Sequence, residues 1–147
     1  MSILEFSLNL PAPTEELIKI SEDFEGLPSF LPDQLKSVKI IEKNQEGVTT
    51  EEIIVFRTIL RKEITQKTLH KKIGEKSLRT EILSGPAKKS IINVLFEQVE
   101  NGTKITINID LKLEMKARIL EPLIKKWYKL ILTSVLYKMN TKIMQSS

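Results

Sequence analysis

The sequence has no cysteine and only one histidine, His70, among its 147 residues. The absence of cysteine excludes a disulfide scaffold, a thiolate metal cage and a cysteine nucleophile. A single histidine leaves no second imidazole for a usual zinc site, so we expect no metal and no cofactor. Five glycines and six prolines are too few for a low-complexity segment.

Long apolar runs are also missing. Lysine and glutamate interrupt every stretch before it reaches the roughly 18 residues that a membrane span needs. Residues 1–5 contain no basic segment and no small-residue cleavage site follows, so we expect no signal peptide. These absences favour a cytoplasmic protein.

What remains is the composition of an ordinary globular domain, with 41% hydrophobic and 29% charged residues. A chain of this length can bury roughly 68–70% of its unfolded surface, so we expect one domain over residues 1–147. The net charge of +4 is uneven, because residues 116–147 carry +6 and residues 1–115 carry −2. The basic character therefore belongs to the C-terminal end.

The N-terminal segment predicts a strand followed by two short helices. Residues 3–10 alternate apolar and polar side chains, which is typical of a half-buried strand. Thr14 is a candidate N-cap for a helix of about three turns, because acidic residues follow it in the first turn. Gly26 and Pro28 end that helix, and a second short helix or turn is expected around 28–31.

From residue 35 onward the sequence favours strands separated by turn residues. The expected strands cover residues 36–42, 48–58, 60–72, 76–83, 89–99 and 103–115. The pair Asn101-Gly102 predicts a type I′ hairpin turn, which needs positive φ at both central residues. The strand after it alternates apolar and polar residues over its whole length, which favours a strand over any other structure.

The last segment, 117–144, changes its period and predicts a long amphipathic helix. Apolar residues that recur every three or four positions share one face, namely Leu120, Ile124, Trp127, Ile131 and Val135. Pro122 lies near the start, where its missing N–H costs little, so the regular helix is expected to begin at about residue 120.

The fold class that follows is α+β. The elements run in the order strand, two helices, six strands, helix. The strands form a curved antiparallel sheet of about seven strands, and the apolar face of this sheet must be covered by another element. The long C-terminal helix is the only element large enough to do so. Because long antiparallel strands coil away from a straight helix, we expect a cavity of roughly 300–1,000 Å³ between sheet and helix.

Besides the order of the elements, three sequence segments resemble a known family. They are Pro-Ala-Pro-Thr-Glu-Glu-Leu at 11–17, Leu-Pro-Ser-Phe-Leu-Pro at 27–32 and Val-Lys-Ile-Ile-Glu at 38–42. With the helix after the longest strand, they resemble the START-related helix-grip superfamily (SRPBCC), in its polyketide cyclase and lipid-transport branch. The resemblance implies a helix-grip fold that holds a hydrophobic ligand, such as a lipid, sterol, quinone or polyketide. Some members are cyclases or hydroxylase subunits, and many only bind or carry.

Candidate ligand-binding residues come from expected inward positions of the sheet and from the helix. They are Phe30, Val38, Ile40, Ile54, Phe56, Val94, Phe96, Ile107, Ile109, Leu111, Trp127, Tyr128, Ile131, Ser134 and Lys138. Ser134 and Lys138 would meet the polar end of a ligand, or Lys138 would simply reach water. Trp127 and Tyr128 would pack a ligand and offer a donor to it, or they would form plain core.

No catalytic residue is assigned. Arg57 and Arg61 share the strand face opposite Phe56, so we expect them to point outward if Phe56 points inward. His70 stands beside two lysines, and the sequence offers no nucleophile or orienting group for it. This context favours a solvated surface histidine.

Several kinds of partner are open. Lys125, Lys126 and Lys129 suit either a peripheral contact with an anionic membrane or a plain solvated face. No nucleic-acid partner is expected, since exposed aromatics and a recognisable motif are missing. The outer sheet face around 53–56 and 91–92 allows a homo-oligomer or another partner contact.

The function we expect is binding or transport of a small hydrophobic ligand without catalysis. The alternative is an enzyme of the polyketide cyclase or dehydratase type, which would need an inward cluster of titratable residues. Alternation along the strands indicates no such cluster. A third hypothesis is an accessory protein whose cavity is filled and whose surface binds a partner.

Overall fold

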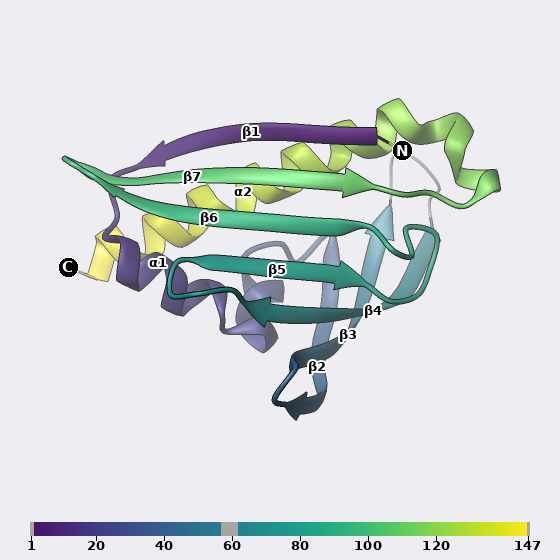
Figure 1. Cartoon of the computed structure of the whole chain (residues 1–147), viewed down its shortest axis with the longest axis horizontal. Coiled ribbons are helices and arrows are strands. Elements are labelled where there is room, and N and C mark those ends of the chain that lie inside the picture. The colour runs from purple at the N-terminus through teal and green to yellow at the C-terminus, as the bar shows by residue number, and fades with distance from the viewer. Residues whose placement is uncertain (1, 57–61, 147) are drawn as a thin grey trace.

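The computed structural model describes residues 2–56 and 62–146, and Figure 1 shows one curved sheet wrapped around the C-terminal helix. The strands are β1 (Ser2–Leu10), β2 (Leu35–Asn44), β3 (Gly47–Phe56), β4 (Lys62–Lys72), β5 (Ser77–Ile82), β6 (Ile91–Val99) and β7 (Gly102–Leu111). The α-helices are α1 (Thr14–Ser21) and α2 (Glu121–Ser146), and two short 3₁₀ helices are η1 (Phe24–Ser29) and η2 (Met115–Leu120).

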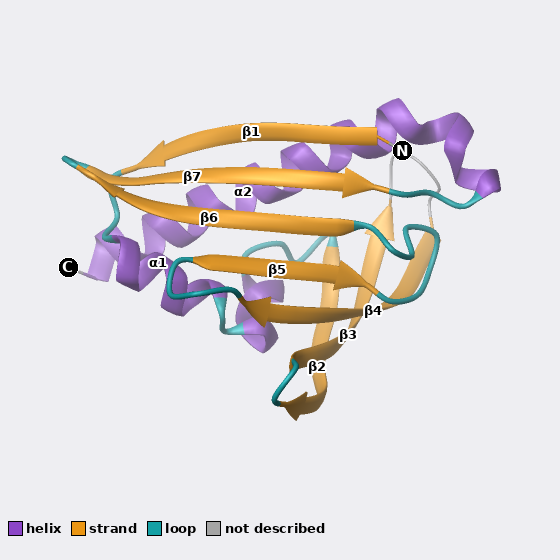
Figure 2. Ribbon diagram, viewed as in Figure 1, coloured by secondary structure: helices purple, strands orange, loops and turns teal. Residues whose placement is uncertain are grey.

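The sheet has the order β1-β7-β6-β5-β4-β3-β2, and every neighbouring pair is antiparallel. Six strands follow one another along the chain through hairpins, and β1 adds to the free edge of β7. Figure 2 shows the helices gathered on one side of this sheet. The predicted α+β helix-grip fold, its seven strands and its element order are confirmed.

Strand β7, which lies between β1 and β6, explains how the core forms. Its inward residues Ile105, Ile107, Ile109 and Leu111 are at most 1% exposed, and polar residues alternate with them. The strand ends at Leu111 and not at residue 115 as expected. Pairing stops there on both sides, because β1 begins opposite Leu111 and β6 begins opposite Asp110.

Helix α2 begins after η2, close to the expected start, with Pro122 in its first turn, where no intrahelical N–H bond is lost. Its buried face is formed by Ile124, Tyr128, Val135, Leu136, Met139 and Ile143. Trp127 and Ile131, which the sequence placed in the same stripe, are only half-buried. The buried face is therefore turned slightly from the predicted one. No helix in the described part of the chain is both long and apolar enough to cross a bilayer.

The corner between β1 and α1 is held by polar bonds, which corrects the predicted cap. The helix N-cap is Pro13, and the Thr14 hydroxyl bonds Thr103 Oγ1 at 2.8 Å instead of a helix N–H. Thr103 donates to the Ala12 carbonyl at 2.8 Å, and Asn140 of α2 accepts the Ala12 N–H at 2.9 Å. Thr14 is buried between helix and sheet, so its hydroxyl serves the tertiary contact.

The β6–β7 hairpin forms where Asn101-Gly102 predicts it, with Val99 opposite Gly102. Its turn is not the expected type I′, because Lys89 is the only described residue other than glycine with positive φ. Gly102 itself has a φ of +142°, and it lies so close to β1 that a Cβ would collide with the carbonyl oxygen of Leu10. The glycine is therefore needed for this close approach.

Substitution of Gly102 tests that requirement. We expect G102A to lower the free energy of unfolding by about 2 kcal/mol or more, because backbone strain and the collision with Leu10 add. G74A is the matched control, since Gly74 also has positive φ, +70°, but nothing lies within 4 Å of an added Cβ. Its cost should be about 1 kcal/mol. Urea unfolding measures both values, and equal losses would contradict the importance of the Leu10 contact.

Candidate functional site

A cavity of about 210 Å³ lies between the sheet and α2. Its walls come from β2 to β7, from α2 and from the segment that contains α1 and η1, and they are mostly apolar. The cavity is smaller than the expected 300–1,000 Å³. Aromatic side chains take up part of the space, since the Trp127 ring lies 4.4 Å from that of Phe56 and 5.1 Å from that of Tyr128.

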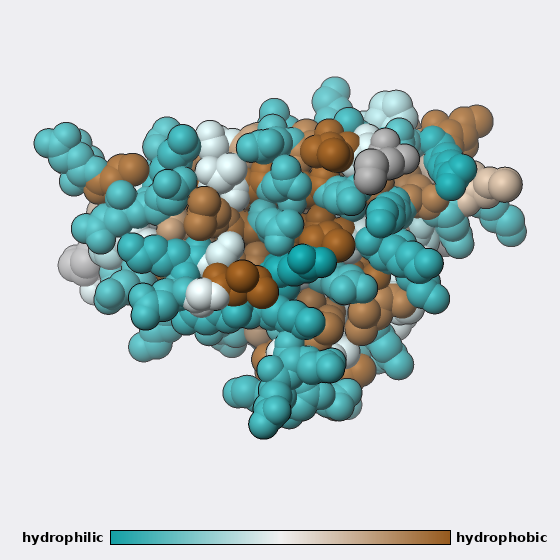
Figure 3. Space-filling model, in the orientation of Figure 1, coloured by the Kyte–Doolittle hydropathy of each residue, from teal (hydrophilic) through white to brown (hydrophobic). Residues whose placement is uncertain are grey.

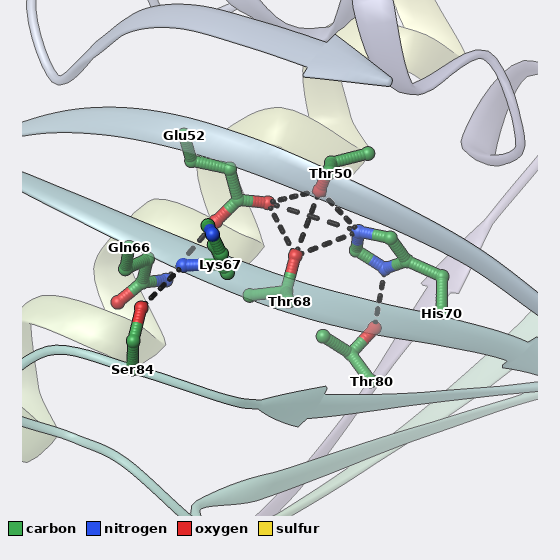
Figure 4. A network of polar contacts seen from close by, with 8 residues as sticks. All are labelled: Thr50, Glu52, Gln66, Lys67, Thr68, His70, Thr80 and Ser84. Atoms are coloured by element: carbon green, nitrogen blue, oxygen red, sulfur yellow. Dashed lines mark hydrogen bonds and ion pairs between the residues drawn. The ribbon is translucent and has the colours of Figure 1, made fainter. Parts of the chain in front are cut away.

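A polar network interrupts this apolar wall on β3, β4 and β5 (Figure 4). Thr50 and Glu52 of β3 lie opposite Thr68 and Gln66 of β4, and residues two apart on a strand share a face. His70 follows Thr68 on the same face of β4. Five side chains of the network line the cavity itself, namely Glu52, Gln66, Thr68, His70 and Thr80.

The Glu52 carboxylate is the centre of the network. Its Oε1 accepts a hydrogen bond from Gln66 Nε2 at 3.0 Å. Its Oε2 accepts hydroxyl bonds from Thr68 at 3.0 Å and from Thr50 at 3.2 Å, and lies 3.7 Å from His70 Nε2. A carboxylate offers about four acceptor positions, so one position, on Oε1, is left for a further donor.

The His70 ring is fixed on three sides. Its Nε2 lies 2.9 Å from the hydroxyls of Thr50 and Thr68, and its Nδ1 lies 2.9 Å from the hydroxyl of Thr80. Each threonine hydroxyl has a single proton, so where both donate to Glu52, the proton of the contacts with His70 belongs to Nε2. Phe24 of η1 stacks on the ring, with centroids 4.1 Å apart and an interplanar angle of 16°.

Two ionisable groups of the cavity have shifted pKa values. Burial alone would raise the pKa of Glu52, but its bonds to His70, Gln66 and Thr68 and the charge of His70 outweigh burial, so the pKa is lowered. Burial, and next the negative charge of Glu52, raises the pKa of Tyr128 well above its ordinary value. At neutral pH the cavity therefore contains a carboxylate and a neutral phenol.

Tyr128 differs from Glu52 in having an unused polar atom. In the described part of the chain no hydrogen bond is found for its hydroxyl, although the side chain lines the cavity. The hydroxyl oxygen is not among the fully buried side-chain atoms without a partner, so it keeps accessible surface at which a bound acceptor can meet it. The site thus presents one free acceptor position, on Glu52, and one free donor, on Tyr128.

Within the described residues, the candidate residues from the sequence fall into two groups. Those that line the cavity are Ile54, Val94, Phe96, Ile107, Trp127, Tyr128 and Ile131. Those that belong to the surrounding core are Phe30, Val38, Phe56, Ile109 and Leu111, and Ile40 is exposed on β2. Whether any of them contacts a ligand remains a prediction.

Ser134 and Lys138 are not among the residues that line the cavity, and Lys138 reaches the surface, as the alternative from the sequence had it. The buried face of α2 is centred on Tyr128 and Leu136, so positions 134 and 138 fall to one side of it. Lys138 is exposed, and its Nζ donates to the carbonyl of Phe30 at 2.9 Å. It therefore ties α2 to the segment after η1.

His70 corrects the interpretation from the sequence, because its side chain is only 9% exposed and faces the cavity. The signal for this network was present in the alternation of β3. If Ile54 and Phe56 point inward, the same period places Glu52 and Thr50 inward as well. Arg57 and Arg61 lie outside the described residues.

Metal ligands do not gather in the described part of the chain. Across residues 2–56 and 62–146, no three His, Cys, Asp or Glu side chains are placed so that they could hold a metal ion together. The polar network is instead a hydrogen-bonded cluster around one carboxylate.

The curved sheet and the long helix that it surrounds define a helix-grip fold, which solved START-like structures share. The sequence matches the family described as polyketide cyclase / dehydrase and lipid transport over residues 10–139, and the chain belongs to that family. No curated protein matches the chain at a significant level.

Solved structures with the same fold share little sequence with it. TTHA0849 from Thermus thermophilus superposes with a TM-score of 0.82 at 17% identity, over 99% of both chains. A START superfamily protein from Mycobacterium smegmatis gives 0.80 at 16% identity, also over 99% of both chains. The Zhui aromatase/cyclase from Streptomyces sp. R1128 gives 0.82 at 12% identity, over 97% of this chain and 95% of that one. These similarities establish the fold.

The lowered pKa of Glu52 predicts a defined pH dependence of stability. Because folding lowers this pKa below 4.5, the charged carboxylate stabilises the folded state above that pH, and this contribution is lost as the pH falls through the lowered value. We expect E52Q to lower the free energy of unfolding by about 1–3 kcal/mol at neutral pH. The difference from wild type should shrink as the pH falls below 4.5.

Denaturant unfolding at a series of pH values measures this difference. E51Q is the matched control, because Glu51 lies next to Glu52 on the opposite face of β3, and it should change the free energy little. A difference between wild type and E52Q that stays constant across the acidic range would show that the carboxylate is not held in its charged form.

Proposed function

We propose that the protein acts as one ligand-binding domain that encloses a compact hydrophobic molecule with a polar group. The observation that carries the proposal is an apolar cavity with a single buried carboxylate, Glu52, in its wall. Ligand pockets typically combine mostly apolar walls with a few placed polar groups, which is the arrangement found here. The family description, which includes lipid transport and cyclase chemistry, supports a hydrophobic ligand.

The size of the cavity limits the ligand. A dry apolar cavity of about 150 Å³ is known to bind benzene, so 210 Å³ suits a molecule of one or two rings. A sterol or a long acyl chain exceeds this volume. Among the ligand classes expected from the sequence, a small quinone-like or polyketide-like ring compound fits best.

The polar groups select the orientation of the ligand. The free acceptor position on Glu52 suits a hydroxyl or amine of the ligand, and the Tyr128 hydroxyl suits a carbonyl or ether oxygen. A bond to the charged carboxylate is worth about 1.5–3 kcal/mol. Apolar contact provides the rest, at about 25 cal/mol per Å² of buried area.

Filling the cavity tests ligand binding directly. Val94 lines the cavity, and Leu95, the next residue of β6, is 40% exposed on the outer face. We expect V94W to weaken the binding of a fluorescent two-ring probe by about tenfold or more, because the indole occupies the ligand's volume. L95W should bind as the wild type does. Native mass spectrometry of both variants reports bound ligand independently, and equal uptake by both would reject the cavity as the binding site.

The role of Glu52 is tested with a matched pair of ligands. Naphthalene and 2-naphthol have the same rings, but only 2-naphthol can donate a hydrogen bond. We expect E52Q to weaken 2-naphthol binding by about tenfold and to leave naphthalene nearly unchanged, because the bond to a charged acceptor is lost. Calorimetric titration measures both affinities. An equal change for the two ligands would mean that Glu52 does not contact the polar group.

A second candidate function is acid–base catalysis of the cyclase or dehydratase type. The observation that favours it is the inward titratable cluster of Glu52, His70 and Tyr128, which the sequence did not indicate. A carboxylate held in its charged form can accept a proton from a carbon acid, and a neutral phenol can donate one to a developing alkoxide. Turnover of a cyclisable poly-β-carbonyl compound that E52Q and Y128F each abolish would support this function over binding alone.

A further inference from the structure

The segment between β7 and α2 exposes apolar side chains that no other described element covers. Met115 and Ile119 of η2 are 82% and 85% exposed, the highest values for large hydrophobic side chains among the described residues. Leu123, in the first turn of α2, is 51% exposed. All three lie within residues 115–123, and we call them the apolar ridge. Three adjacent apolar residues on a surface need a partner to explain them.

Buried neighbours and hydrogen bonds fix the backbone of the segment that carries the ridge. Leu113, just before the exposed residues, and Ala117, between two of them, are buried and anchor the segment in the core. Arg118 Nε donates to the Leu113 carbonyl at 3.2 Å, and Glu114 N–H donates to the Pro86 carbonyl at 3.0 Å. The exposure of the apolar side chains is therefore built into the fold.

Basic residues surround the ridge. The loop between β5 and β6 packs beside it, because Ser90 Oγ accepts the Lys112 N–H at 2.8 Å and donates to the Lys112 carbonyl at 3.0 Å. We define the η2 tip as residues 83–90 together with residues 112–126. These residues include seven basic and two acidic side chains, a net charge of +5. Exposed lysines and arginine of the tip are Lys88, Lys89, Lys112, Lys116, Arg118 and Lys126.

Figure 1 places η2 at the end of the molecule opposite the β4–β5 and β6–β7 turns, and Figure 3 shows apolar side chains beside hydrophilic ones at that end. The two features needed for binding to an anionic bilayer thus lie together. Apolar side chains enter the interface between headgroups and acyl chains, and lysines and arginines next to them meet the negative surface.

We propose that the η2 tip binds the surface of a membrane that contains anionic lipids. The apolar ridge inserts into the interface, and the surrounding lysines and Arg118 contact headgroups. A folded protein partner fits less well, because three protruding side chains offer far less than the roughly 800 Å² per partner of a stable protein interface. Isolated apolar side chains can insert into a bilayer, because the bilayer surface does not need a shape complementary to the protein.

This proposal changes the surface predicted from the sequence. Lys126 belongs to the tip, but Lys129 lies further along α2 with its Nζ 5.6 Å from the Phe6 ring, over the edge strand β1. Lys125 is half-buried. The binding surface is therefore the start of α2 together with η2 and the neighbouring loop, and not one face of the whole helix.

Sedimentation with vesicles tests the proposal with full-length protein. We expect wild type to bind vesicles of phosphatidylcholine and phosphatidylglycerol and not vesicles of phosphatidylcholine alone, and to dissociate at about 1 M salt, where the screening length is about 3 Å. M115S/I119S should reduce binding by about tenfold or more. I73S/V99S is the matched control, because Ile73 directly follows β4 and Val99 ends β6, and both are exposed apolar side chains outside the tip. It should bind as wild type does.

Charge reversals provide a second, independent comparison. K88E/K116E and K76E/K104E change the net charge by the same amount, and all four lysines are exposed, but only the first pair lies in the η2 tip. We expect at least about tenfold weaker binding for K88E/K116E, because each lysine near the surface contributes about a factor of five. K76E/K104E should retain most of the binding.

The outcomes separate this proposal from its alternatives. Equal losses in both charge-reversal variants would mean attraction by net charge alone and would overturn the tip as the binding surface. Equal binding to neutral vesicles, or no binding to anionic ones, would overturn the anionic membrane as partner. E52Q should bind vesicles normally, since Glu52 lies inside the cavity, so the result does not depend on whether the proposed ligand is correct.

Discussion

The antiparallel register between β3 and β4 sets Glu52 opposite Gln66 and Thr50 opposite Thr68, and this pairing determines what the cavity contains. A slip by one residue would turn every side chain of a strand to the other face. Glu51 would then lie inside, and Glu52 would lose the donors that satisfy it. Because a buried charge without partners is so costly, the polar network and the register support each other.

The same network explains why the cavity persists next to a long helix. Bulky apolar residues in place of this network would extend toward α2 and reduce the space, whereas Phe96 and Ile107 of β6 and β7 form part of the apolar wall of the cavity. Threonine, glutamine and glutamate instead bond to one another along the wall, so their polar atoms need no partner from the helix. Phe24 covers His70 from η1 and completes the enclosure.

Much of the fold followed from the sequence, because the alternation over β7 and the change of period at α2 identify the two elements that form the core. The ends of strands were less predictable. Strand β7 ends where the pairing with its neighbours β1 and β6 ends, and the sequence of β7 alone does not contain this information. The polar side of the cavity was missed because inward positions were inferred from apolar residues, whereas Gln66, Thr68 and His70 of β4 are polar. Only pairing with β3, where Ile54 marks the inward face, would have revealed them.

Fold and chemistry lie on different parts of this chain. Structures that share its fold at 12–17% identity can keep a curved sheet and a long helix with largely different residues, since apolar side chains exchange freely where patterning is kept. The carboxylate, the imidazole and their threonines have no such freedom, because each needs a specific donor or acceptor. Ligand choice in this protein should therefore be set by β3 and β4, with Tyr128 across the cavity, and not by the fold that it shares.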